Sequence, residues 1–172
     1  MSTYVKLARH SAEHYVRTNE PLPLPPALPP EALRQKACYV SIFENPGRRL
    51  RSMYGQPLPY QPTLAEEIIT NTIIAISNHQ TRRVRHADLS YLVYSVALLG
   101  PLQRISDPDH LDPQHFGLYL KSTTEKSALL LPQRVGIETG QDQIATALRE
   151  SRIDSHREDF TMYRFEVTHY DE

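Results

Sequence analysis

The sequence contains no tryptophan and a single cysteine, Cys38, among its 172 residues. A lone cysteine cannot close an intrachain disulfide, so the fold must depend on its own core, which a chain of this length can supply. A lone thiol is typical of reducing compartments, and no signal peptide is visible, so we expect a cytoplasmic protein. The missing tryptophan removes one of the side chains that most often anchor interfaces.

Long apolar runs and an excess of one charge are also absent. No stretch approaches the roughly 18 apolar residues of a membrane-spanning helix, so we expect no membrane association. The 19 basic and 20 acidic residues give a formal net charge of −1, which argues against nucleic-acid binding because such binding neutralises several phosphates. Basic residues cluster only at positions 48–51 and 82–85. Either cluster could hold one anion, although a solvated basic edge is the simpler interpretation.

Motifs of catalysis are missing as well. The sequence contains no GxSxG elbow, phosphate-binding loop, dinucleotide fingerprint or zinc-ligand pair, so it predicts no cofactor and no metal site. The acidic and histidine-rich loop at residues 107–115 lacks the glycine and glutamate of a calcium loop, and its Asp-Pro pairs are typical of turns. Cys38 lies in an apolar segment, where we expect an inert core thiol.

Hydrophobic periodicity predicts three helices and six strands. The expected helices are residues 4–17, 63–76 and 141–150, and the expected strands are residues 37–43, 49–54, 91–99, 116–122, 128–132 and 161–170. Because the strands come in neighbouring pairs, we predict a single α+β domain over residues 1–172 with a largely antiparallel sheet.

Residues 21–30 hold six of the 14 prolines. Proline lacks an amide proton and disfavours helix in its predecessor, so this segment should be an extended strap with polyproline character. We expect the strap to lie along the domain; binding of a proline-recognising partner is the alternative.

The second strand of the predicted hairpin ends in Arg51, Ser52, Met53, Tyr54 and Gly55. Arginine presents a planar fork that suits carboxylate or phosphate, and glycine adopts backbone angles closed to other residues. If the strand end opens into a cleft, these five residues form a candidate ligand-binding site. The alternative is an arginine on an edge strand followed by a turn glycine.

The order of segments resembles the AMMECR domain family, also known as AmmeMemoRadiSam system protein A. LRSMYG resembles the family signature LRGCIG, and PTLAEEIITNTIIAI resembles the helix that follows it. YSVALLGPLQRI, FGLYL, ALLLPQ and YRFEVTHY resemble further family segments in the same order. The resemblance implies an α/β main lobe with a smaller lobe, the signature facing a cleft between them, and Memo-type or radical-SAM proteins as partners. It implies no established reaction.

Departures from the signature bear most on function. Ser52 and Met53 stand where the signature has glycine and cysteine, and a thioether cannot supply a thiolate nucleophile or metal ligand. We therefore predict a divergent, non-catalytic or vestigial member that binds a protein or a small anion.

The competing hypothesis is an enzyme of unknown reaction. In it, Arg51 would act with a base from the cleft, and such a base would need a perturbed pKa within reach of the guanidinium. The candidate bases are His79, His115 and Glu138.

Overall fold

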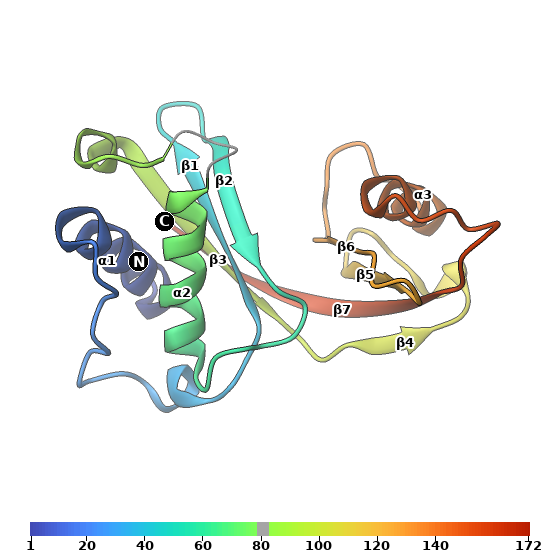
Figure 1. Cartoon of the computed structure of the whole chain (residues 1–172), viewed down its shortest axis with the longest axis horizontal. Coiled ribbons are helices and arrows are strands. Elements are labelled where there is room, and N and C mark those ends of the chain that lie inside the picture. The colour runs from blue at the N-terminus through green and yellow to red at the C-terminus, as the bar shows by residue number, and fades with distance from the viewer. Residues whose placement is uncertain (79–82) are drawn as a thin grey trace. The chain divides into compact units, whose positions relative to one another are not determined.

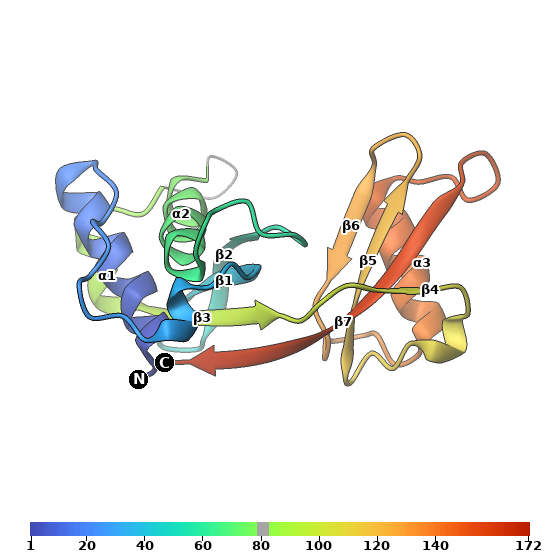
Figure 2. The ribbon, with the colours of Figure 1, turned by 90° about the horizontal axis from the view of Figure 1, so that it is seen from below.

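The computed structural model describes residues 1–78 and 83–172, which form two compact units. Unit 1 comprises residues 1–98 and 168–172, and unit 2 comprises residues 99–167 (Figures 1 and 2). Unit 1 contains α1 (Thr3–Thr18), β1 (Cys38–Glu44), β2 (Arg49–Gly55), α2 (Leu64–Ser77) and β3 (Leu92–Leu99). Unit 2 contains β4 (Gln103–Ile105), β5 (Phe116–Ser122), β6 (Ser127–Leu130) and α3 (Gly140–Ser151). Strand β7 (Phe160–Asp171) begins in unit 2 and ends in unit 1.

The fold is α+β, and its strands pair antiparallel, as the sequence predicted. In unit 1 the strand order is β2–β1–β3, and the end of β7 lies beside β3, where the Glu172 N–H donates to the Tyr94 carbonyl at 3.2 Å. In unit 2, β5 pairs with both β6 and β7, and β4 pairs with β7. Among the residues that the structure describes, no helix combines the length and apolarity needed to cross a bilayer.

Helices α1 and α2 begin at capping side chains. The Ser2 hydroxyl accepts the Val5 N–H at 3.2 Å, and the Thr63 hydroxyl accepts the Glu66 N–H at 3.2 Å. Thr63 also donates to the Glu66 carboxylate at 2.8 Å. These bonds satisfy amides that the first turn of a helix leaves without partners, which fixes where each helix starts.

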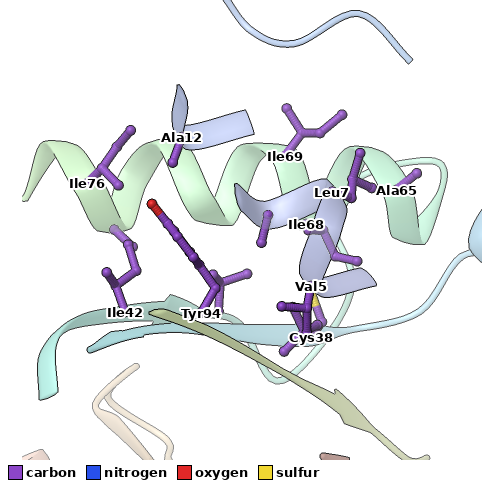
Figure 3. Packing of buried hydrophobic residues seen from close by; sticks show 14 of the residues in the cluster. Val5, Leu7, Ala12, Cys38, Ile42, Ala65, Ile68, Ile69, Ile76 and Tyr94 are labelled. Carbon is purple, nitrogen blue, oxygen red and sulfur yellow. The ribbon is translucent and has the colours of Figure 1, made fainter. Parts of the chain in front are cut away.

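The core of unit 1 lies between these two helices and one face of the sheet (Figure 3). Alternate residues of β1 face the helices, and Cys38, Val40 and Ile42 are fully buried. The buried position expected for Cys38 is confirmed. Side chains from α1, α2 and β3 complete the cluster, including Val5, Leu7, Ala12, Ala65, Ile68, Ile69, Ile76 and Tyr94.

In unit 2, α3 packs on β5 and β6. Leu118, Leu120 and Leu130 from the strands and Ala147 from the helix are buried together. Strand β4 was not predicted, because its residues are few and largely exposed and therefore show no apolar pattern.

The proline strap has no helix or strand from residue 21 to residue 29, and a short 3₁₀ helix, η1 (Pro30–Leu33), follows it. Leu22 and Leu28 pack against the core, and Pro25 between them is half-buried. Burial at every third residue fits a polyproline II segment, which has three residues per turn. Leu22 and Leu28 thus hold the strap against the core of unit 1.

Candidate functional site

The signature residues lie on β2, at the edge of the unit 1 sheet. Within the described part of the chain, β2 pairs only with β1. Ile42 lies opposite Ser52, but the next residue, Phe43, lies opposite Leu50, so the register skips Arg51. Arg51 therefore sits at a β-bulge, a local irregularity that redirects a side chain.

The bulge directs the Arg51 guanidinium toward two carboxylates. Its Nη1 lies 2.8 Å from Glu44 Oε1, and its Nη2 lies 3.3 Å from Asp88 Oδ2. The side chains of Arg51 and Asp88 are only 6% and 5% exposed. An external anion would have to compete with both carboxylates for this guanidinium.

Each carboxylate has further donors. Asp88 lies in the 3₁₀ helix η2 (His86–Tyr91) and accepts the Tyr91 hydroxyl at 2.6 Å and the Arg85 N–H at 2.9 Å. Glu44 also bonds Arg49 at 2.5 Å. Hydrogen bonds from Arg49 and then Arg51 hold the pKa of Glu44 below its usual range. The network therefore ties the hairpin to η2.

The next three signature residues divide between the two faces of the sheet. Ser52 and Tyr54 lie opposite Ile42 and Val40, on the side of the helices, and Ser52 is only 6% exposed. Tyr54 packs against the unit 1 core. Met53 lies on the other face and is half-buried. The side chains predicted to form one site therefore point in two directions.

Close packing against β1 leaves no room for a side chain at Gly55. A Cβ at this position would lie 2.3 Å from Tyr39 Cδ2 and 2.5 Å from the Cys38 carbonyl oxygen. Both distances are shorter than van der Waals contact permits, so β2 can approach β1 here only without a side chain. This is a packing reason for glycine that is independent of any ligand.

A polar cluster next to the signature strand, built around the fully buried Glu67 and Asn71, was not predicted from the sequence. Glu67 Oε2 accepts the backbone N–H groups of Tyr60 and Gln61 at 3.1 and 2.9 Å. The Tyr60 hydroxyl donates to Asn71 Oδ1 at 2.6 Å, and the Asn71 amide donates to the Cys38 carbonyl at 2.9 Å. Glu67 and Asn71 stand four apart on α2 and so share one helical face, a spacing that is visible in the sequence.

Burial governs the acidity of this cluster. It raises the pKa of the Glu67 carboxyl, and it raises the pKa of the Cys38 thiol to about 12. A charged group loses its hydration when buried, so the neutral form is favoured in both cases. The only thiol of the chain is therefore protonated and a poor nucleophile.

The candidate residues of the enzyme hypothesis do not fall within one described unit. His79 lies outside the described residues. Arg51 belongs to unit 1, whereas His115 and Glu138 belong to unit 2. His115 is 75% exposed at its side chain and contacts Asp112 through Nδ1 at 2.5 Å.

In the acidic loop, Asp107 and Asp112 accept nearby backbone N–H groups, each at 2.9 Å, as turn-forming aspartates do. Across residues 1–78 and 83–172, no three metal-ligating side chains gather in one place.

The chain belongs to the AMMECR1 family, whose model matches residues 5–170. A Clostridium acetobutylicum protein is 33% identical over 170 residues, which cover 98% of this chain but only 36% of that protein. This chain thus spans about a third of that relative's length. A Thermotoga maritima protein is 31% identical over 97% of this chain and 96% of its own.

The fold is shared with a solved structure. The crystal structure of the uncharacterised protein PH0010 from Pyrococcus horikoshii superposes with a TM-score of 0.87 at 24% identity. The match covers 98% of this chain and 89% of that one. The family resemblance drawn from the sequence motifs is confirmed by the match of the family model to residues 5–170.

Proposed function

We propose that this chain is a non-catalytic binding domain and that β2, with the signature residues Arg51–Gly55, forms part of the surface that receives a partner protein. The observation that carries the proposal is the position of β2. Within the described residues it pairs with β1 on one side only. The unpaired backbone groups of an edge strand are a template on which a partner can add a strand.

Exposed apolar side chains accompany this edge. Leu50 on β2 is 50% exposed, and Leu58 and Tyr60 in the following loop are 60% and 43% exposed. Burying the rest of a large apolar side chain contributes on the order of 1 kcal/mol or more, so three of them can supply a useful part of a binding energy. Arg49, also on β2, places an 80% exposed charged side chain beside these apolar residues.

The chemistry of the signature supports binding rather than catalysis. Met53 occupies the position of the family's cysteine and supplies no thiolate. The charge of Arg51 is balanced by Glu44 and Asp88. Protein binding therefore explains the strand better than anion binding at Arg51 does, since an anion would have to displace a carboxylate.

We propose a Memo-type or radical-SAM protein as the partner, as the family resemblance implies. The Clostridium acetobutylicum relative supports an association with other protein segments, because the matched region makes up only 36% of that chain. We also propose a cytoplasmic location, which the buried free thiol of Cys38 supports.

The test is the affinity of the purified chain for Memo-type and radical-SAM proteins of the same organism, measured by biolayer interferometry. Leu50→Asp and Leu58→Asp should each weaken binding at least about tenfold, since about 1.4 kcal/mol corresponds to a factor of ten. Val135→Asp is the matched control, because Val135 lies in unit 2 and is 99% exposed.

If Leu50→Asp and Leu58→Asp bound the partner as tightly as the wild type does, β2 and its following loop would not be the binding surface. An equal loss with Val135→Asp would show a non-specific effect of added charge. Failure of the wild type to bind either protein would refute the proposed partners.

A further inference from the structure

A second feature of unit 1 is a cavity of about 300 Å³, where the last turns of α1 and α2 meet residues 83–86. Ile76 and Val84 give it an apolar wall. Its polar lining consists of Tyr15, Arg83, Arg85 and His86. The cavity therefore combines an apolar surface with several cationic or hydrogen-bonding groups, as small-molecule sites do.

Arg82 of the second basic cluster lies outside the described residues. The described arginines of the two clusters differ in how their charge is balanced. In the first, Arg48, Arg49 and Arg51 all pair with carboxylates. In the second, Arg83 donates to the neutral Asn19 side chain at 3.1 Å. Within the described ranges, neither Arg83 nor Arg85 takes part in an ion pair.

The nearby carboxylate of Asp88 does not offset this charge. Its oxygens are held by Arg51, by the Tyr91 hydroxyl and by the backbone N–H of Arg85. Asp88 therefore forms its ion pair with Arg51 and not with the Arg85 guanidinium.

The ends of α1 and α2 oppose the positive charge only in part. Each helix C-terminus carries an effective charge of about −0.5, so two of them offset about one of the two arginine charges. Moreover, two carbonyls at these ends already have donors. The Tyr15 carbonyl accepts the Asn19 N–H at 2.8 Å, and the Ile76 carbonyl accepts the Val84 N–H at 3.0 Å. The described lining of the cavity thus contains two guanidinium groups and no carboxylate.

We infer that this cavity binds the phosphate group of a small organic phosphate through Arg83 and Arg85. A guanidinium forms paired hydrogen bonds with phosphate, and two of them match a dianion better than a carboxylate with one charge. Tyr15 and the apolar wall of Ile76 and Val84 face the organic part of the ligand. The cavity volume is at the lower end of the range for ligand sites, so the ligand has few heavy atoms.

Isothermal titration calorimetry with glycerol 3-phosphate, inorganic phosphate, acetate and glycerol tests the inference on the intact chain. Glycerol 3-phosphate should bind saturably and more tightly than the other three. Arg83→Ala and Arg85→Ala should each weaken its binding at least about tenfold, as expected for loss of a hydrogen bond to a charged group. Both residues are exposed, so the variants should unfold at the wild-type temperature.

Arg48→Ala is the matched control, because it removes an exposed arginine whose guanidinium is paired with Asp171. Unchanged affinity in this variant supports a specific site, and an equal loss would overturn it in favour of general attraction by positive charge. Absence of saturable binding to the wild type up to about 10 mM would overturn the site itself. Inorganic phosphate binding as tightly as the ester would overturn the assignment of Tyr15 and the apolar wall to an organic group.

Discussion

Replacing Arg51 with methionine should destabilise the domain by about 3 kcal/mol. The substitution keeps an unbranched chain but removes the charge that faces Glu44 and Asp88. Breaking a buried ion pair costs about 3–5 kcal/mol, because the remaining charge stays buried. We expect the lower end of this range, because Asp88 still accepts the Tyr91 hydroxyl and Glu44 still accepts Arg49 in the variant.

The assay is urea unfolding followed by circular dichroism, because the chain has no tryptophan for fluorescence. The transition midpoint should fall while the slope with denaturant stays constant, which separates lost stability from a change in the unfolded state. Arg48→Met is the control, because its pair with Asp171 is about half exposed on both sides. An exposed pair contributes about 1 kcal/mol or less.

Asp88→Asn completes a double-mutant cycle with Arg51→Met. If the two groups are coupled, the double variant should lose less stability than the sum of the single losses, because neither charge is then left alone. Additive losses, or a loss below about 1 kcal/mol for Arg51→Met, would refute the view that this pair holds the hairpin to η2.

Three further outcomes follow from the residues around the signature strand. Gly55→Ala should cost about 1–3 kcal/mol in urea unfolding, because its Cβ would overlap Tyr39 and the Cys38 carbonyl. The Cys38 thiol, with its pKa raised to about 12, should react with a disulfide reagent only under denaturing conditions; fast labelling of the native chain would contradict its burial. Burial raises the pKa of Glu67, so the native state binds its proton more tightly than the unfolded state does. Stability should therefore fall as pH rises from about 4.3 through the native pKa, and Glu67→Gln should remove this fall in unfolding experiments across that pH range.

The local elements were largely predictable because their signals lie close together in the sequence. The turn at residues 45–47 and the strands beside it give the hairpin, and Thr63 marks the start of α2. Strand β3 was recognised by its continuous apolar run, which matches its central position next to β1. The burial of the polar Asn71 on α2 was not predicted. Asn71 is fully buried because the Tyr60 hydroxyl and the Cys38 carbonyl satisfy its amide.

The environment of the signature was less predictable, because it depends on contacts distant in sequence. The position of Arg51 near the end of the second strand was expected, and Glu44 lies just across the same hairpin. Asp88 lies 37 residues after Arg51, and no local sequence pattern links Asp88 to Arg51. The bulge that redirects Arg51 is likewise a property of strand pairing rather than of composition. The ligand-binding role of residues 51–55 stays a prediction.

The opposite orientations of Cys38 and Met53 have a practical consequence for testing the proposed role of β2. Cys38 is fully buried, whereas Met53 lies on the face of β2 away from the helices and is half-buried. Met53→Cys would therefore place one addressable thiol within the signature while leaving the native one silent. A fluorophore attached there would report on events at β2 without competing labels. Because Cys38 is buried, a label at position 53 would be the only one on the native chain.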